Sequence, residues 1–312
     1  MKLFITGVSG FVGGHLTDVA FGRGMKIIGQ ARNNDMAQFP IYQSEISPET
    51  NWYDALAGVD CVVHCAARVH EMNDKSLDHL ESYRHVNTYG TLNLARQAAT
   101  AGVKRFVFLS TIKVNGENTD KGSCFCADDP VSPQDSYSLS KLEAEQELAK
   151  VAEETGMEVV IIRLPLVYGP GVKGNFFRMI QWVKRGVPLP FGAIHNRRSL
   201  ISNDNLADFI LTCIDHPAAS NQTFLVSDGE DLSLSSLLNK LGQSMNKPVK
   251  LVSIPESVLF LGMILFNKRA VAQRLIGNLQ IDTSKARDLL NWEPLESVDQ
   301  GLKKAVSGLT QT

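Results

Sequence analysis

The feature that most constrains the fold is a regular alternation of apolar runs and helical stretches over the first 165 residues. The runs LFIT, KIIG, CVVHCA, RFVFLS and EVVIIRL are rich in β-branched residues, and segments with apolar residues at helical spacing separate them. Such alternation predicts parallel strands that are covered by helices on both faces. We therefore expect an α/β fold built on a doubly wound parallel sheet.

After Arg163 the pattern changes, which indicates a second, smaller lobe. Turn-forming residues crowd VYGPGVKGN and GVPLPFG, and helical spacing returns over residues 203–216 and 233–245. A last short helix in SKARDLLNWEP is expected to end before its proline. The expected division is a sheet domain over residues 1–165 with a returning segment near 203–228, and an α/β C-terminal lobe made of residues 166–202 and 229–312.

The charge balance argues against nucleic acid or an anionic membrane as the main ligand. The 312 residues carry a formal net charge of -2 without a long run of lysine or arginine. A strand begins within two residues of Met1, which leaves no room for a cleavable signal, so we expect a cytoplasmic protein with no membrane span. The longest apolar run, VLFLGMILF at 258–266, has half the length that a bilayer requires. It is compatible with a core helix, a dimer surface or a contact for a membrane-bound partner enzyme.

Cysteine and histidine spacing gives no support for a metal site. The seven histidines include no H-x3-H pair, and the cysteines form no second pair at zinc-like spacing. We interpret the cysteines as reduced thiols and expect no metal. The five are Cys61, Cys65, Cys124, Cys126 and Cys213.

A glycine motif follows the first strand directly. In TGVSGFVGGHL, the residues Gly7, Gly10 and Gly13 have the spacing G-x2-G-x2-G, and a helix is expected to begin near Phe11. Glycines let the backbone turn tightly and approach a pyrophosphate, while free N–H groups at a helix start favour negative charge. Because the motif follows the first strand of an alternating pattern, it predicts a dinucleotide-binding loop.

A second motif places a phenol and an ammonium on one face of a helix. In DSYSLSKLEAE, Tyr137 and Lys141 are four residues apart, which is the spacing of helix neighbours. A phenol has a pKa of about 10. Because a neighbouring ammonium favours the phenolate, we expect a lowered pKa that lets Tyr137 act as general acid or base. Thr111 ends the strand RFVFLST, and its hydroxyl is expected to hold a substrate oxygen beside Tyr137.

Together these motifs resemble the extended short-chain dehydrogenase/reductase family of nucleotide-sugar epimerases, dehydratases and reductases. The resemblance rests on TGVSGFVG, DCVVHCAA, VNTYGTLNLA, YSLSK and RLPLVYGP, and it covers nearly the entire chain. It implies a Rossmann-type domain with a C-terminal lobe that binds a UDP-sugar substrate. It also implies a catalytic group formed by Thr111, Tyr137 and Lys141. Homodimers are common in the family, although no motif in this sequence specifies a dimer.

The resemblance also assigns binding residues. Asn87 matches an asparagine near the crevice, and Arg198, in NRRSLISNDNLADFI, matches an arginine that grips the diphosphate, a task that suits a planar guanidinium. His64 and Cys65 are interpreted as packing residues. Cofactor contacts are expected from Gly7, Gly10, Phe11, Val12, Gly13, Arg32, Glu45, Ile46, Ala66, Ala67, Asn87, Tyr137 and Lys141. Substrate contacts are expected from Thr111, Lys113, Asn175, Arg198 and Arg274.

The end of the second strand bears on the choice of cofactor. Ala31 and Arg32 occupy the place where a carboxylate often binds the ribose of NAD. A guanidinium there suits the 2'-phosphate of NADP instead. We therefore expect NADP(H) to be favoured, with NAD(H) as the other candidate.

The segment after Thr111 bears on the reaction. The 4,6-dehydratases of the family that the chain resembles have an Asp-Glu pair directly after the catalytic threonine. This chain has Ile112 and Lys113 at those positions, so dehydration is not expected. Lys113 is expected to face the crevice, because side chains two apart on an extended segment share a face. The stretch STIKVNGE, followed by ADDPVSPQDSYSLSKLEAE, most resembles the reductases of this family. That resemblance makes the favoured prediction an NADP(H)-dependent reductase of the 4-keto group of a UDP-4-keto-6-deoxy-hexosamine, in the synthesis of surface-polysaccharide precursors.

Two alternatives remain open. One is an NAD-dependent 4-epimerase of UDP-glucose or UDP-N-acetylglucosamine. The other is a non-catalytic, cofactor-sensing module on the same fold, which is disfavoured because the chain keeps both Tyr137 and Lys141.

Overall fold

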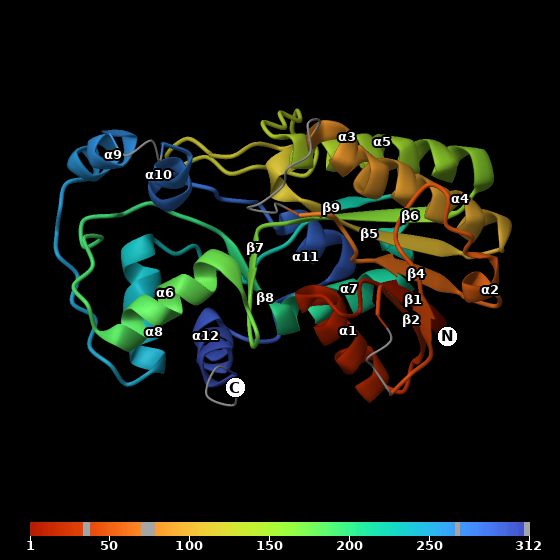
Figure 1. The fold of residues 1–312 in the computed structure, drawn as a ribbon, viewed down its shortest axis with the longest axis horizontal. Helices are drawn as coiled ribbons and strands as arrows, with labels where there is room; N and C mark the ends of the chain where they lie inside the picture. The colour runs from red at the N-terminus through yellow and green to blue at the C-terminus, as the bar shows by residue number, and fades with distance from the viewer. Residues whose placement is uncertain (34–37, 70–78, 266–268, 309–312) are drawn as a thin grey trace.

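A seven-stranded parallel sheet is the central layer of the computed structural model, which describes residues 1–33, 38–69, 79–265 and 269–308 (Figure 1). Its strands are β1 (Lys2–Thr6), β2 (Lys26–Ala31), β3 (Ile41–Gln43), β4 (Cys61–His64), β5 (Arg105–Thr111), β6 (Glu158–Leu164) and β9 (Thr223–Leu225). Their order is β3-β2-β1-β4-β5-β6-β9, and all neighbours run parallel. The expected doubly wound α/β sheet is confirmed. The chain order reverses between β1 and β4, and sheets of this type bind ligands at such a switch point.

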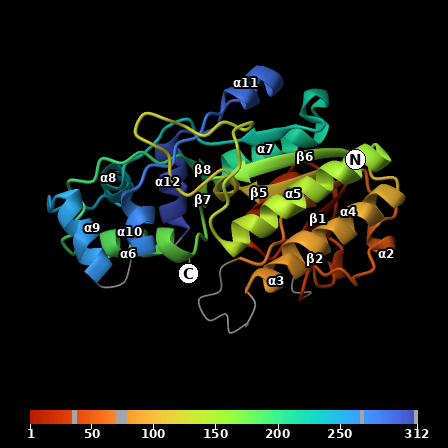
Figure 2. The same cartoon turned by 90° about the horizontal axis from the view of Figure 1, so that it is seen from above.

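Helices cover both faces of the sheet, as Figure 1 and Figure 2 show from two directions. One face carries α1 (Phe11–Gly22), α7 (Asn203–Asp215) and α11 (Ser284–Leu290), and the other carries α2 (Tyr53–Leu56), α4 (Thr91–Thr100) and α5 (Ser136–Thr155). Strand side chains alternate between the two cores, so that Leu3 packs with Leu16 of α1 whereas Phe4 packs on the face of Leu148 of α5. Burial on both faces is why the strands are almost continuously apolar.

Short elements connect these layers. α3 (His79–Tyr83) continues into a π-helical stretch at Arg84–Gly90 and then into α4. Two 3-10 turns follow β5 and α7, at Ile112–Val114 and Pro217–Ala219.

A smaller lobe lies beside the large sheet, on the left in Figure 1. Its strands are β7 (Leu166–Tyr168) and β8 (Leu200–Ser202), which pair in parallel. Its helices are α6 (Gly174–Arg185), α8 (Leu234–Ser244), α9 (Glu256–Leu265), α10 (Arg269–Ile276) and α12 (Val298–Ser307). Residues of α6, α8 and α12 share one core. α9 lies at the end of this lobe that is farthest from the large sheet, with α10 between the two (Figure 1).

The apolar segment near residue 260 is not a core helix. It forms α9, and none of the residues of α9 is buried; Leu261 is 60% and Leu265 78% exposed. The core-helix interpretation is therefore wrong for residues 258–265, because α9 stands at the margin of the lobe. Phe266 lies outside the described residues. Among the described helices, none is both long enough and apolar enough to cross a bilayer.

Candidate active site

A pocket of about 830 Å³ opens between the carboxyl ends of the large sheet and the smaller lobe. Its wall on the sheet side includes Thr111, the last residue of β5, and Tyr137, in the first turn of α5. The lobe contributes residues of α6, α8, α9 and α10. Six residues that the sequence analysis assigned to catalysis or substrate binding share this pocket: Thr111, Lys113, Tyr137, Asn175, Arg198 and Arg274.

Capping of α5 positions Tyr137. The Asp135 carboxylate accepts a hydrogen bond from the Ser138 N–H at 2.7 Å, and Ser138 Oγ accepts one from the Asp135 N–H at 3.2 Å. This reciprocal capping fixes where the helix begins. The Tyr137 ring then meets the Tyr83 ring edge to face, with 6.0 Å between the ring centroids.

Burial raises the pKa of Tyr137, and the negative charge of Asp135 raises it further. The expectation of a lowered pKa is therefore wrong for the protein alone, because desolvation of the phenolate is the largest effect on this group. Tyr137 keeps its proton at neutral pH in this state.

Lys141 is buried, with 2% of its surface exposed. Its ammonium lies 4.1 Å from the centroid of the Phe108 ring and, within the described ranges, makes no hydrogen bond. Burial lowers the pKa of Lys141 to about 7, although the nearby Glu145 opposes this change. Lysines are rarely buried without a carboxylate partner, and a pKa so perturbed is typical of functional sites.

A buried ion pair holds α5 against the sheet. Arg163 of β6 donates from Nη2 to Glu145 Oε2 at 2.7 Å and from Nε to both carboxylate oxygens at 3.2 Å. Ser110 Oγ donates to the same carboxylate. Because Ser110 precedes Thr111 and Glu145 lies on the helix of Tyr137, this network fixes the two hydroxyl groups of the pocket relative to each other. No sequence motif singled out these partners.

The glycine-rich loop fits a pyrophosphate. Gly7 has a φ of 69°, and a Cβ there would lie 2.9 Å from the Cα of Ala66. A Cβ on Gly13 would collide with the Gly7 carbonyl. α1 begins at Phe11 with no side-chain cap, so the N–H groups of its first turn have no partner within the helix. Close backbone approach and an uncapped helix start are what a dinucleotide phosphate requires, so the loop fits the cofactor that the motif implies.

Gln30 of β2 supports this loop, and no motif predicted it. Its Oε1 accepts a hydrogen bond from the Gly7 N–H at 3.0 Å, and its Nε2 donates to the Ser44 carbonyl at 2.6 Å. The available signal was a glutamine within the otherwise apolar strand KIIGQA, because a buried amide requires hydrogen-bond partners.

His64 is a packing residue, as expected. It is fully buried, and its ring nitrogens are hydrogen-bonded to Thr6 Oγ1 at 2.8 Å and Thr91 Oγ1 at 2.9 Å. Burial lowers the pKa of His64 to about 3, so the ring is neutral at physiological pH.

Asn87 ties the segment after β4 to α5. Its Oδ1 accepts a hydrogen bond from the Arg68 N–H at 2.8 Å, while its Nδ2 donates to the Arg68 carbonyl at 3.0 Å and to Ser140 Oγ at 3.1 Å. Both amide protons are used within the protein. A direct contact of Asn87 with a cofactor would therefore involve its Oδ1 alone.

The end of β2 leaves Arg32 exposed. Ala31 is buried, whereas Arg32 directly after it faces solvent, and the Arg32 carbonyl accepts a hydrogen bond from Gln43 Nε2 at 3.0 Å. Other expected cofactor contacts follow the neighbouring strands: Glu45 and Ile46 come after β3, and Ala66 and Ala67 come after β4.

Cations of the pocket converge on Glu117, a carboxylate that no motif singled out. Lys113 Nζ lies 2.7 Å from Glu117 Oε1, and Arg274 Nε lies 3.7 Å from Glu117 Oε2. Burial lowers the pKa of Arg198 to about 10, Glu117 opposes this, and Arg274 adds to it. Lys113 is also paired with Asp135 at 2.6 Å. Lys113 is thus balanced by two carboxylates, and the excess positive charge of the pocket comes from Arg198, Arg274 and Arg178 of α6.

Lys113 lines the pocket as expected, but for a different reason. It lies in a 3-10 turn, not on an extended segment, and its N–H donates to Thr111 Oγ1 at 3.3 Å. The Thr111 oxygen therefore accepts from the backbone, which leaves its hydroxyl proton for a ligand.

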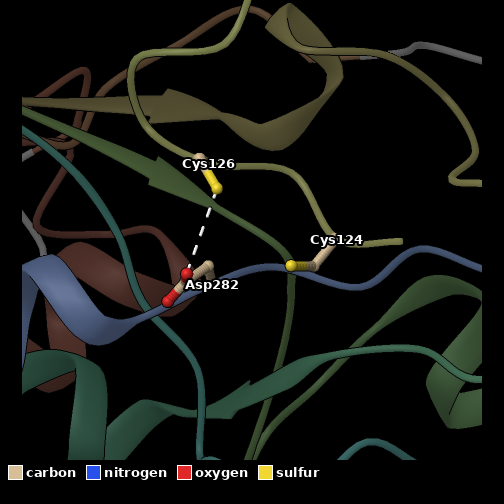
Figure 3. A group of neighbouring side chains, drawn as sticks. All are labelled: Cys124, Cys126 and Asp282. Atoms are coloured by element: carbon tan, nitrogen blue, oxygen red, sulfur yellow. Dashed lines mark hydrogen bonds between the residues drawn. The ribbon is translucent and has the colours of Figure 1, made fainter. Parts of the chain in front are cut away.

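Two thiols and a carboxylate lie together outside the pocket (Figure 3). Cys124 and Cys126 flank Phe125, whose N–H donates to the Gln280 carbonyl at 2.9 Å, and this pairing brings Asp282 beside the thiols. The candidate ligand atoms lie within 4.8 Å of one another. Sequence spacing could not reveal this group, because Asp282 is far away along the chain. None of the three lines the pocket.

A profile of the NAD dependent epimerase/dehydratase family matches residues 3–227. The chain belongs to this family. It is 44% identical over 316 residues to a UDP-glucose 4-epimerase of Vibrio cholerae, a match that covers 99% of this chain and 96% of that protein. It is 28% identical over 273 residues to an N-acetyl-alpha-D-glucosaminyl-diphospho-ditrans,octacis-undecaprenol 4-epimerase of Escherichia coli O157:H7, covering 85% of this chain and 79% of that protein.

The fold also matches solved structures. A UDP-N-acetylglucosamine 4-epimerase from Bacillus cereus superposes with a TM-score of 0.80 at 19% identity, over 98% of both chains. Membership of the extended short-chain dehydrogenase/reductase family is thus confirmed, as is the class of NAD(P)-dependent oxidoreductase or 4-epimerase. The similarity to the Vibrio protein favours the 4-epimerase over the 4-keto reductase that we first preferred.

Proposed function

We propose that the protein is a 4-epimerase that acts on a sugar held by its diphosphate and recycles bound NAD(H). The observation that carries this proposal is a single pocket in which Thr111 and Tyr137 stand at one end and Arg198 and Arg274 stand beside them. The 44% identity to a UDP-glucose 4-epimerase over nearly the full length supports the epimerase reaction.

In this proposal Tyr137 is the acid and base at the sugar O4. Oxidised nicotinamide, when bound in the crevice, supplies a hydride acceptor for C4 and a positive charge that lowers the pKa of a nearby phenol. Tyr137 takes the O4 proton and later returns it, while the Thr111 hydroxyl donates a hydrogen bond to the same oxygen. Lys141, whose pKa burial lowers to about 7, would help to hold the cofactor.

Arg198 and Arg274 are proposed to bind the two phosphates, with Asn175 of α6 at their side. A guanidinium binds phosphate oxygens in pairs, and these two arginines, with Arg178 of α6, carry the excess positive charge of the pocket. The ammonium of Lys113 is already held by two ion pairs, with Glu117 and Asp135. Lys113 is therefore proposed to form part of the pocket wall and to separate the sugar from Glu117, without binding a phosphate.

One observation favours a second candidate, an NADPH-dependent reductase of a 4-keto sugar. Arg32 is exposed directly after β2, where a carboxylate would repel the 2'-phosphate of NADP. A charge-assisted contact from Arg32 to that phosphate would be worth about 1.5–3 kcal/mol, or roughly 10- to 150-fold in affinity.

One experiment separates the two candidates. The purified protein is given UDP-glucose or UDP-N-acetylglucosamine without added cofactor, and in parallel UDP-4-keto-6-deoxy-N-acetylglucosamine with NADPH or NADH. The epimerase predicts an inverted C4 with no net change in nicotinamide absorbance. Stoichiometric consumption of NADPH without inversion, and a weakened preference for NADPH in Arg32→Ala, would establish the reductase instead.

A further inference from the structure

The pocket has a distal half that differs in character from the end at Tyr137. The cations are connected to the catalytic end, since Glu117 joins Arg274 to Lys113, and Lys113 pairs with Asp135. On the other side of these cations the wall comes from α6, α8 and α9, which Figure 1 shows away from the large sheet. Residues of this distal wall are Met179, Trp182, Leu234, Leu237, Leu259 and Met263.

The distal wall offers few polar partners. Apart from backbone groups and from Asn175 and Arg178 in the first turns of α6, its described side chains provide only the indole N–H of Trp182 and the hydroxyl of Ser233. That hydroxyl is already used, because Ser233 caps α8: it accepts from the Ser236 N–H at 3.0 Å and donates to Ser236 Oγ at 2.9 Å. A pyrimidine base and a ribose carry several hydrogen-bonding groups, and burying them without partners is costly. A hydrocarbon chain has no such groups.

The apolar wall continues onto the surface through α9. One side of this helix places Leu259 and Met263 in the pocket, while Leu261 and Leu265 on its outer side are 60% and 78% exposed. After Glu256 and Ser257, the helix contains no further polar side chain. A surface helix that is apolar on all sides is expected where a hydrophobic partner covers it.

We propose that the sugar diphosphate is carried by a polyprenyl lipid. The diphosphate lies at Arg198 and Arg274, the isoprenoid chain follows the distal wall, and its outer part leaves over α9 toward the membrane that holds it. This inference rests on the proposed reaction at C4. The pocket is complementary to such a molecule, because two guanidinium groups can bind a dianionic diphosphate and a continuous apolar surface begins beside them.

The direct test compares two donors in detergent solution: UDP-N-acetylglucosamine and N-acetylglucosaminyl-diphosphoundecaprenol. Inversion at C4 is followed by chromatography of the sugar that acid hydrolysis releases. The proposal predicts a kcat/KM at least about tenfold higher for the lipid-linked sugar. Turnover of the UDP-sugar with no turnover of the lipid-linked one overturns this inference and leaves the proposed function standing. If neither these two donors nor UDP-glucose is inverted at C4, the proposed function is overturned and this inference with it.

Two substitutions in the distal wall test whether the isoprenoid chain of the substrate binds there. Leu259→Gln and Met263→Gln should each lower kcat/KM for the lipid-linked sugar by about tenfold, while the value for the UDP-sugar changes less than about twofold. Both residues are only partly buried, so these variants should fold. Leu295→Gln is the matched control, because Leu295 is 66% exposed and lies outside the pocket. Equal losses with both donors would overturn the placement of the chain.

The outer face of α9 is tested with vesicles of phosphatidylethanolamine and phosphatidylglycerol. Wild type and Leu295→Glu should sediment with the vesicles, whereas the double variant Leu261→Glu, Leu265→Glu should remain in solution. The opposite finding has two parts: wild type does not bind vesicles and is a dimer by light scattering, whereas the double variant is a monomer. In that case a second copy of the chain covers α9, and the lipid exit is overturned.

Discussion

Replacement of Lys141 by methionine should stabilise the protein at the expense of its chemistry. Methionine keeps the length of the side chain over the Phe108 ring but removes an ammonium that is 2% exposed. Burial lowers the pKa of Lys141 from 10.5 to about 7. Because one pKa unit is worth about 1.4 kcal/mol, keeping this group charged in the folded state costs roughly 4–5 kcal/mol.

The sign of the pH dependence follows from the same shift. The folded pKa of Lys141 lies below the unfolded one, so the unfolded chain binds more protons between these two values. The cost is fully present below the folded pKa, and it disappears as the pH rises toward the unfolded pKa. From about pH 6 to about pH 9, the free energy of unfolding of wild type should therefore rise by roughly 2–3 kcal/mol relative to that of Lys141→Met.

Urea unfolding of nucleotide-free wild type and Lys141→Met, at both pH values, measures this difference. Other titrating groups contribute equally to both proteins and cancel in the comparison. Lys141→Met should be the more stable protein, most of all at the lower pH. A stability difference that is the same at both pH values would refute the reasoning, because Lys141 would then titrate as it does in the unfolded chain.

Three further predictions follow from the pocket and its support. Tyr137→Phe should lower kcat by about a hundred- to ten-thousand-fold with nucleotide affinity retained, and a variant that keeps a tenth of wild-type turnover would remove Tyr137 from its role. Arg198→Ala should raise the KM for the sugar diphosphate by an amount equal to about 1.5–3 kcal/mol, and unchanged calorimetric affinity would contradict the assignment. Glu145→Gln, which breaks the buried pair with Arg163, should destabilise by about 3–5 kcal/mol. Its control, Glu147→Gln in the exposed pair with Lys150, should cost under about 1 kcal/mol, so similar urea midpoints for the two variants would argue against the buried network.

The sheet and the cofactor loop could be predicted because their signals are local. Each strand is a short apolar run, and a glycine spacing directly after the first of them specifies a tight turn into a helix. The exposure of α9 could not be predicted in the same way. An apolar composition indicates that a helix is covered, but it does not indicate by which neighbour. In the sequence, Leu261 and Leu265 therefore cannot be distinguished from leucines of the core, although both are exposed in the structure.

The pocket residues were predictable where a motif marks them and not where partners come from distant elements. Thr111 at a strand end and Tyr137 at a helix start were both found. Glu117 and Gln30 were not, because each acquires its role from a partner on another element. The raised pKa of Tyr137 was missed for a related reason, since burial depends on the packing of the whole site.

The central claim is that the hydrogen on C4 leaves and returns through one bound cofactor while Tyr137 handles the O4 proton. The most direct measurement uses UDP-linked and polyprenyl diphosphate-linked sugars that carry deuterium at C4, with mass spectrometry of the released C4 epimer. We expect the inverted sugar to retain its deuterium at C4, and we expect the Tyr137→Phe variant to form almost no inverted sugar. An inverted sugar whose deuterium has exchanged with solvent, or no inversion of either donor, would contradict the account.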